Sequence, residues 1–309
     1  VRRLVGSEMC IRDSLPGVLR QIKNQRGNFS KQYVFLDDGS TDDSLNIIRA
    51  ETANWNNTVI KTQSNKGSAA ATNAAIKLAT QRYIKFVDAD DLLTENATKV
   101  LLNNLKKSDA CLIFGEQQSF FSASELELCG PSEHTTVEVI NQPLRLALRN
   151  SLFNPSQCLV RTDAIRKVGG CDEAVIHSQE YGLTLRLAKR WQFLRLNDTV
   201  VYLPEKSYGR LSTNEGRQLQ RVTLSVAHFL NENPDVSSSI KRYACRRVAG
   251  RALKYVKRRG EKVDISRWYF RYLAAKLNLI KDHALFAAEC VSAFKVAEKT
   301  SVEKQAPNY

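Results

Sequence analysis

The chain has 309 residues, enough for one large domain or for a domain with an appendage, and 43% hydrophobic content is ordinary for a globular protein. A formal net charge of +14 indicates an anionic partner, such as nucleic acid, a membrane surface or a phosphorylated substrate. The seven cysteines are scattered and form no C-x-x-C pair, which argues against a disulfide framework or a zinc site and favours a reducing compartment. The longest apolar stretch, residues 284–294, contains a glutamate and is too short to span a bilayer.

The first 14 residues have neither helical nor strand periodicity, and the single methionine, Met9, is internal. Residues 4–14 are similar to the peptide made when a sequencing adapter is translated at the broken end of a read. A native disordered or targeting segment is the alternative, although no apolar core is long enough for a signal peptide. We therefore expect residues 1–14 to be non-native and the genuine sequence to begin near Leu15.

Helices and strands are expected to alternate from Leu15 to Phe114. Apolar runs bounded by turn residues predict strands, and apolar residues at helical spacing predict helices. The expected strands are 33–36, 58–62, 83–87 and 110–114, and the expected helices are 15–25, one through 45–48, 68–79 and 94–106. This alternation is typical of an α/β fold with a doubly wound, mostly parallel sheet.

The second half of the chain is less regular. Residues 116–140 are polar and predict a surface loop over the site. Helices are expected over 142–149, 162–167 and 178–190, with a strand over 199–203. After about Tyr208 the strands disappear, and basic helical segments continue to the end.

Two aspartate clusters each follow an apolar run. Asp37 and Asp38 follow the first expected strand, and Asp88, Asp90 and Asp91 follow the third. Ligands of open α/β sheets bind outside the carboxyl ends of the strands, where both clusters are expected. Because several adjacent carboxylates are unfavourable unless a cation neutralises them, the second cluster predicts a metal site.

A single Asp-x-Asp is weak evidence, but here it stands within an ordered set of motifs. The set comprises Asp37-Asp38-Gly39-Ser40, Asn65-x-Gly67, Asp88-Ala89-Asp90-Asp91, Gly169-Gly170-Cys171-Asp172-Glu173 and Gln179-Glu180-Tyr181. Through this set the chain resembles the family 2 glycosyltransferases, which are inverting enzymes of the GT-A fold. The resemblance implies a GT-A domain over residues 15–212 and leaves a basic helical extension over 213–309. In the family a central first strand precedes the helix that here begins at Leu15, so the resemblance implies an amino-terminally truncated domain.

The resemblance assigns the first cluster to the nucleotide of a sugar-nucleotide donor. Asp38 is expected to bind the nucleobase, with Asp37 beside it. Asn65 and Gly67 match the family's Asn-x-Gly, in which glycine lets the backbone approach the nucleotide. Thr72 replaces the arginine of the family's Ala-Arg-Asn, which removes a charged contact.

The resemblance assigns the second cluster to a metal ion. Mg²⁺ or Mn²⁺ takes oxygen ligands and commonly uses carboxylates together with substrate phosphates. Asp90 is the favoured ligand. Asp88 and Asp91 are expected to bind the metal as well or to contact the ribose, and the sequence does not rank these roles.

The resemblance places the general base at Glu180, where the family commonly has aspartate. The alternative is that Glu180 only stabilises the start of a helix. Asp172 and Glu173 are candidates for the acceptor side or are ordinary turn residues. Arg210 falls where the family often closes a segment over the diphosphate, which an arginine could bind.

The carboxyl-terminal third is strongly basic. Residues 240–281 carry 14 lysines and arginines, with an apolar helical face between them and aromatic residues following. Such helices suit an anionic membrane surface. The alternative is an appendage packed on the catalytic domain with a solvated basic face, and no recognition motif supports nucleic acid.

We therefore expect a metal-dependent inverting glycosyltransferase that uses a nucleotide-sugar donor, expected to be a UDP-sugar, and a glycan or lipid-linked acceptor. The expected setting is synthesis of a bacterial cell-envelope polysaccharide or lipopolysaccharide, in the cytoplasm or peripherally at the inner face of the plasma membrane. One alternative is a basic peripheral membrane or polyanion-binding protein with a degenerate site. The other is a Mg²⁺-dependent phosphatase of the haloacid-dehalogenase type, disfavoured because Leu92 stands where those enzymes have Thr or Val.

Overall fold

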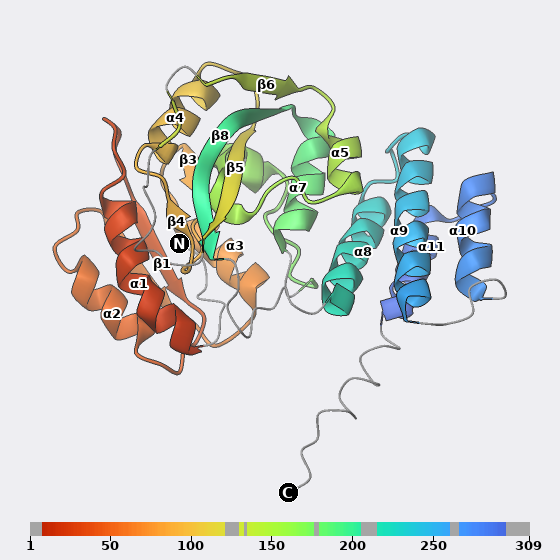
Figure 1. Cartoon of the computed structure of the whole chain (residues 1–309), viewed down its shortest axis with the longest axis horizontal. Helices are drawn as coiled ribbons and strands as arrows, with labels where there is room; N and C mark the ends of the chain where they lie inside the picture. Colours follow the sequence, from red (N-terminus) through yellow and green to blue (C-terminus); the bar gives the residue numbers. More distant parts are fainter. Residues whose placement is uncertain are drawn as a thin grey trace, which may run out of the picture.

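The computed structural model describes residues 8–120, 130–132, 135–175, 179–204, 215–259 and 266–294, with side chains from residue 15 onward and without that of residue 179. Helices and strands alternate along the first part of the chain (Figure 1). These elements are α1 (Glu8–Lys23), β1 (Tyr33–Asp37), α2 (Ser44–Thr52), β2 (Thr58–Thr62), α3 (Ser68–Leu78), β3 (Tyr83–Lys85), β4 (Leu92–Leu93), α4 (Ala97–Lys106) and β5 (Leu112–Phe120).

The remaining elements complete a mixed sheet and then form a group of helices. They are β6 (Val137–Ile140), α5 (Pro143–Arg149), the 3₁₀ turn η2 (Pro155–Gln157), β7 (Cys158–Arg161), α6 (Thr162–Lys167), α7 (Gln179–Arg190), β8 (Phe193–Pro204), α8 (Glu215–Glu232), α9 (Ser238–Arg258), α10 (Arg267–Leu277) and α11 (His283–Cys290). The last four helices lie together at one end of the molecule (Figure 1).

The strands form two hydrogen-bonded sheets among the described residues. β1 and β2 pair in parallel, and a six-stranded sheet has the order β3-β7-β5-β8-β4, with β6 also paired to β8. Only β5 and β8 are parallel in the larger sheet, since β3–β7, β4–β8, β5–β7 and β6–β8 are antiparallel. The α/β fold with carboxyl-terminal helices is confirmed, but the expected mostly parallel pairing is corrected to a mixed one.

The predicted polar loop over residues 116–140 is wrong at both of its ends. β5 continues to Phe120 by pairing its polar half with β8, and β6 pairs with the first residues of β8. Neither segment shows the alternation of a half-buried strand, because β6 has no buried residue and residues 116–120 of β5 are half-buried or exposed. Pairing with a long neighbouring strand decides their structure instead.

Helix α1 begins at Glu8, seven residues before the expected start at Leu15. Its predicted apolar face is confirmed, because Leu15, Val18, Leu19 and Ile22 are all buried. They belong to one apolar cluster with residues of β1, β4 and α4.

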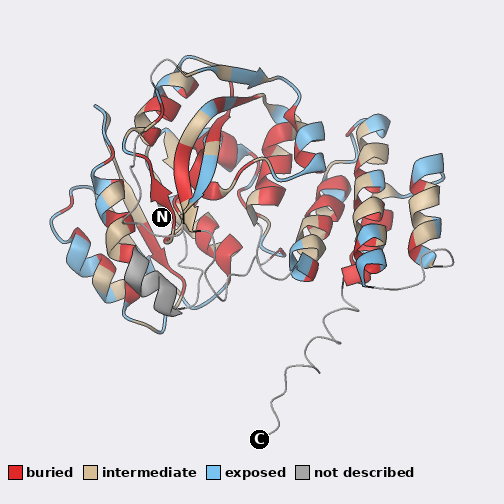
Figure 2. Ribbon diagram, viewed as in Figure 1, coloured by how far each residue is buried: buried red, intermediate tan, exposed pale blue. Residues whose placement is uncertain are grey.

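The carboxyl-terminal helices share a core with the sheet. One apolar cluster includes Leu185 and Leu187 of α7 together with Phe229 of α8, Val248 of α9 and Ala287 of α11. Figure 2 shows buried positions running from the sheet through α7 into these helices. Side-chain caps mark where α9, α10 and α11 begin. No helix within the described ranges is long and apolar enough to cross a membrane.

Candidate functional site

The first carboxylate pair lies where β1 ends, and both side chains are buried. Asp38 Oδ1 accepts hydrogen bonds from Gln63 Nε2 at 2.8 Å and from the Lys66 backbone N–H at 2.9 Å. Its Oδ2 accepts one from the Gly67 backbone N–H at 3.0 Å. Gly67 has φ of 90°, which a side chain would strain. Asp38 therefore fixes the loop that leads from β2 into α3.

Asp37 shapes the turn that follows β1. Its Oδ1 accepts a hydrogen bond from the Ser40 backbone N–H at 3.0 Å. Gly39 has φ of 78°, and a Cβ there would lie 3.0 Å from the Asn65 backbone nitrogen. The structure thus brings the predicted residues Asp37, Asp38, Asn65 and Gly67 together in two touching turns.

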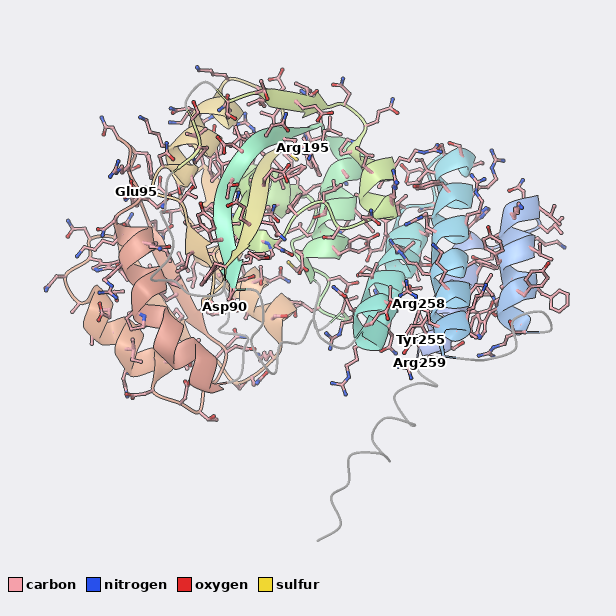
Figure 3. The ribbon with its side chains drawn as sticks, in the orientation of Figure 1. Asp90, Glu95, Arg195, Tyr255, Arg258 and Arg259 are labelled. Atoms are coloured by element: carbon pink, nitrogen blue, oxygen red, sulfur yellow. The ribbon has the colours of Figure 1, made fainter. Side chains whose placement is uncertain are left out.

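The second aspartate cluster occupies the turn between β3 and β4. The Asp88 backbone N–H donates to Ser156 Oγ at 2.9 Å, and the Asp91 N–H donates to the Asp88 carbonyl at 3.2 Å. Asp88 and Asp90 are half-buried, whereas Asp91 is buried. Figure 3 shows Asp90 at the lower end of the central sheet. Ser156, which carried no local sequence signal, is therefore a neighbour of the predicted metal ligands.

Lys85 lies just before this turn. Its Nζ donates to the Ser156 carbonyl, and burial lowers the pKa of Lys85 to about 8 although Cys158, Asp91 and Asp88 oppose the shift. The turn therefore has beside it a half-buried lysine whose amine loses its proton more readily than that of an ordinary lysine.

The carboxylates suit a metal shared with a substrate better than a closed protein cage. No group of three or more His, Cys, Asp or Glu among the described side chains is placed to hold an ion. Asp88, Asp90 and Asp91 nevertheless offer oxygen donors on one turn. Mg²⁺ commonly binds one or two carboxylates and completes its coordination with substrate phosphates and water. The donor set therefore fits Mg²⁺ or Mn²⁺ bound with a phosphorylated ligand.

Glu180 lies in the first turn of α7 and is half-buried. Thr184 Oγ1 donates to its carbonyl at 2.7 Å. The next residue, Tyr181, is buried, and burial raises its pKa although Arg251 of α9 opposes the shift. The start of α7 is thus anchored in the shared core, which gives Glu180 a fixed backbone position.

The glycine pair before α7 forms a loop that α3 holds. Gly169 and Gly170 have φ of 78° and 73°, a conformation that favours glycine. The Cys171 N–H donates to Asn73 Oδ1 at 2.7 Å, and Asn73 Nδ2 donates to the Cys171 carbonyl at 3.0 Å and to Glu173 Oε1 at 2.8 Å. The Asn73 side chain therefore links this loop to α3, the helix that follows Gly67.

A contact from α8 holds the same loop. His228 Nδ1 lies 2.5 Å from Asp172 Oδ2, and Asp172 Oδ1 accepts a hydrogen bond from the Ala174 N–H at 3.0 Å. Arg186 of α7 donates to the Gly170 carbonyl at 2.7 Å. His228 was not predicted, because it is 56 residues from its partner and has no motif around it.

Some predicted residues are not tested by this geometry. Arg210 lies outside the described residues. Thr72, which replaces the family's arginine, is buried, and its hydroxyl donates to the Ser68 carbonyl at 2.7 Å. This position therefore packs within the fold.

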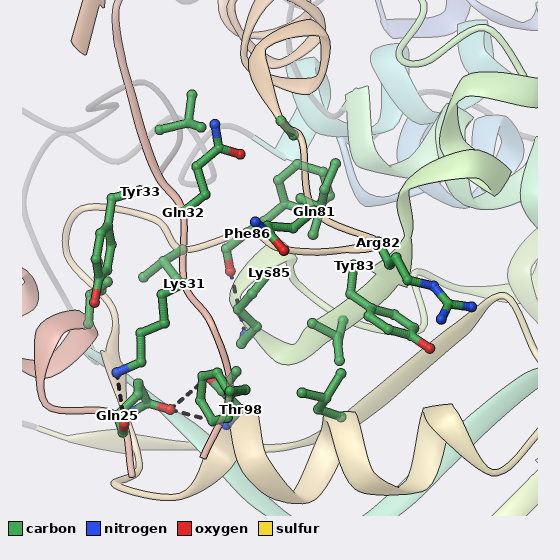
Figure 4. A pocket seen from close by; sticks show the side chains of 18 of the residues that line it. Gln25, Lys31, Gln32, Tyr33, Gln81, Arg82, Tyr83, Lys85, Phe86 and Thr98 are labelled. Carbon is green, nitrogen blue, oxygen red and sulfur yellow. Dashed lines mark hydrogen bonds between the residues drawn. The ribbon is translucent and has the colours of Figure 1, made fainter. Parts of the chain in front are cut away.

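A cavity of about 400 Å³ lies between β1 and β3 (Figure 4). The two strands contribute Val34 and Ile84, α3 contributes Ile76, and α4 contributes Leu102. None of the predicted aspartates is among its described lining residues. The cavity is therefore distinct from the two turns that carry Asp37 with Asp38 and Asp88 with Asp90 and Asp91, which we call the carboxylate turns.

Comparison with known proteins identifies the family. Residues 8–160, about half of the chain, match the family described as "Glycosyl transferase family 2". The chain belongs to this family. The match includes both carboxylate turns and ends before the loop that precedes α7.

Curated relatives are glycosyltransferases or glycan synthases by name. Glycosyltransferase GlyG of Streptococcus pneumoniae is 36% identical over 90 residues, which are 29% of this chain and 30% of GlyG. Chondroitin synthase of Escherichia coli is 26% identical over 213 residues, which are 67% of this chain and 29% of the synthase. A third relative, UDP-Glc:alpha-D-GlcNAc-diphosphoundecaprenol beta-1,3-glucosyltransferase WfgD of Escherichia coli, is 23% identical, over 62% of this chain and 74% of WfgD. The chain thus spans less than a third of GlyG and of the synthase.

A solved structure confirms the GT-A fold of the family. S. aureus TarS 1–349 in complex with UDP-GlcNAc superposes with a TM-score of 0.63 at 15% identity. The alignment covers 97% of this chain and 90% of that one. At this identity the likeness concerns the fold, including its carboxyl-terminal helices.

Proposed function

We propose that the protein transfers a sugar, with inversion, from a UDP-sugar to an acceptor hydroxyl. The observation that carries the proposal is the joining of the nucleotide-side turns to the acceptor-side loop: Asp38 fixes the start of α3, and Asn73 of α3 holds Cys171 and Glu173. The names of WfgD and of the TarS complex, which mention UDP-Glc and UDP-GlcNAc, support a uridine nucleotide.

In this proposal the first cluster binds the donor. Asp38, with Asp37 beside it, recognises the nucleobase, and Asn65 and Gly67 line the nucleotide. The hydrogen bonds already made by Asp38 hold it rigidly, so little ordering entropy is lost on binding. Asp88 and Asp91 contact the ribose or the metal.

Asp90, with Asp88 and Asp91, would hold Mg²⁺ or Mn²⁺. When bound, the ion neutralises charge that develops on the departing nucleoside diphosphate. Lys85 is less suited to this role, because its Nζ already donates to the Ser156 carbonyl and its pKa is lowered to about 8.

Glu180 is the proposed general base. It removes the proton of the acceptor hydroxyl while that oxygen attacks the anomeric carbon from the face opposite the leaving group. The new carbon–oxygen bond forms as the bond to the diphosphate breaks, UDP leaves with the bonding electron pair, and the proton stays on Glu180. Asp172 and Glu173 position the acceptor, and Arg210 is a further candidate for the diphosphate.

The proposed acceptor is a glycan or a lipid-linked sugar of the bacterial envelope. WfgD, by name, acts on a diphosphoundecaprenol-linked sugar. A lipid-linked acceptor would place the enzyme in the cytoplasm at the inner face of the plasma membrane. The positive net charge of +14 favours such an anionic surface.

The function itself is tested with UDP-sugars, each with Mn²⁺ or Mg²⁺. We expect calorimetric UDP binding and slow donor hydrolysis, with hydrolysis falling about 10²–10⁴-fold in Glu180→Gln while UDP binding is retained. Glu173→Gln, a nearby acidic residue that the proposal places on the acceptor side, is the control and should leave donor hydrolysis and UDP binding close to those of the unaltered chain. Phosphatase turnover without donor hydrolysis would refute the proposal.

A further inference from the structure

The outermost helix of the extension exposes large apolar side chains. Of the six large hydrophobic residues exposed in the described parts of the chain, four lie between residues 270 and 285. Phe270 is 60% exposed, Leu277 63%, Leu279 70% and Leu285 57%. Scattered apolar residues are normal on a surface, but such a concentration marks an interaction site.

Helix α10 has two apolar stripes on opposite sides. Trp268 and Ala275 are buried and face the rest of the protein. At 100° per residue, Phe270, Leu273 and Leu277 fall on the opposite side of the helix. Figure 1 shows α10 at the outer edge of the molecule, beyond α9. The second stripe therefore points away from the protein core.

The end of α10 widens this stripe. Asn278 has φ of 63°, and the Leu279 N–H donates to the Ala274 carbonyl at 2.9 Å. This arrangement brings the residue after the left-handed one back against the last helical turn. Leu279 therefore lies near Ala274, which is on the same side as Phe270 and Leu277. We call Phe270, Leu273, Leu277 and Leu279 the outer stripe.

The surroundings of the outer stripe are positively charged. Between Asp235 and Asp282 the sequence has two acidic residues, Glu261 and Asp264, against 14 lysines and arginines. Lys276 and Lys281 are exposed beside the stripe, and Lys254, Lys257 and Arg259 are exposed nearby in the sequence of α9 and its end. A second copy of so basic a chain would be repelled from this face.

We propose that the outer stripe binds an anionic lipid surface. The apolar side chains enter the boundary between headgroups and acyl chains while the surrounding lysines and arginines remain among the phosphates. Two weak signals combine in this way to give stable peripheral binding. The inference specifies the membrane partner named in the proposed function and does not depend on the sugar-transfer chemistry.

Sedimentation of the full chain with lipid vesicles tests the proposal. The chain should sediment with vesicles of phosphatidylcholine and phosphatidylglycerol and not with phosphatidylcholine alone. Binding should fall as salt rises from about 0.1 M to about 1 M, because the Debye length shrinks from about 10 Å to about 3 Å. Equal binding to both vesicle types, or to neither, would overturn the proposal.

Matched variants locate the surface. Phe270→Ser with Leu277→Ser and Leu279→Ser should weaken vesicle binding about tenfold or more, because three exposed apolar side chains no longer enter the lipid. The control Val139→Ser with Leu146→Ser removes apolar residues that are 50% and 43% exposed elsewhere and should bind like the unaltered chain. Equal binding by the triple variant and the unaltered chain would overturn the proposal.

Two further measurements keep the outcomes separate. Lys276→Glu with Lys281→Glu should weaken binding at low salt even if the triple variant does not fold. Ultracentrifugation without lipid should show the same mass for the unaltered chain and the triple variant, and a dimer lost in the variant would overturn the proposal in favour of self-association. UDP binding should be the same in every variant as in the unaltered chain. Absence of UDP binding by the unaltered chain would count against the proposed function and not against the lipid-binding surface.

Discussion

The two carboxylate turns differ in the hydrogen bonds that hold them. Asp38 is buried and accepts hydrogen bonds from a side chain and two backbone N–H groups of the β2–α3 loop. In the turn between β3 and β4, the hydrogen bonds to Ser156 and Asp88 use backbone N–H groups, and Asp90 is half-exposed. In the first turn a carboxylate holds the neighbouring loop, and in the second turn backbone N–H groups hold the turn itself.

This difference suggests which aspartate stabilises the fold and which is available to bind a ligand. A buried carboxylate with three donors stabilises the folded chain whether or not a ligand is bound. The half-exposed Asp90 carboxylate stands on a turn that has backbone hydrogen bonds of its own, so a ligand can reach this side chain. Substitutions in the two turns should therefore be distinguishable by which property they change.

The largest effect is expected at Asp90. Asp90→Asn should lower donor hydrolysis about 10²–10³-fold, because a charged metal ligand is lost, while the urea midpoint stays unchanged. EDTA should abolish activity of the unaltered chain and Mn²⁺ should restore it. Asp109→Asn, at an exposed aspartate outside both clusters, is the control and should change neither property. Unfolding of Asp90→Asn would contradict the contrast between the two turns, because it would show that Asp90 stabilises the fold.

A smaller effect, on stability, is expected at Asp38. Asp38→Asn should lower the free energy of unfolding by about 2–3 kcal/mol, because the amide cannot accept all of the hydrogen bonds that the carboxylate accepts. The exposed Asp43, which accepts a bond from Asn46 Nδ2, is the control, and Asp43→Asn should cost less than about 0.5 kcal/mol. Urea unfolding measures both. Full stability of Asp38→Asn would mean that the loop does not depend on its carboxylate.

Measured per pH unit, the smallest effect on stability is a pH dependence at Lys85, beside the second turn. Its pKa is about 8 in the folded chain against 10.5 for an ordinary lysine, so the unfolded chain holds more protons between these values. Stability from this group therefore rises with pH across this window, by at most about 1.4 kcal/mol per pH unit. Lys85→Met should remove the rise, and Lys61→Met, at an exposed lysine, should keep it. Urea midpoints at pH 8, 9 and 10 compare the variants, and identical slopes would contradict the assignment.

The sequence predicted elements well where local signals were sufficient. β2 and α6 have the expected bounds, and β1 differs from the prediction by one residue, because apolar runs and turn residues delimit them. β7 was missed, although all but its last residue are buried, because so short an apolar run has no periodicity of its own. Strand direction also escaped prediction, since it depends on which distant strands pair.

The sequence predicted those residues of the site that belong to family motifs. Asp38, Asn65 and Gly67 were predicted as neighbours and lie in touching turns. The roles of Asn73, Ser156 and His228 were not predicted, because each acts through a partner between 56 and 100 residues away. Hydrogen bonds between residues so far apart in the sequence produce no local motif from which they could be predicted.

The apolar cluster that joins α7 to α8, α9 and α11 has an evolutionary consequence. Helices that share a core with a neighbouring region cannot be exchanged between proteins as an independent cassette. A recombinant that joined these helices to another transferase would also have to inherit the matching surface of α7. The extension and the sheet should therefore be inherited together.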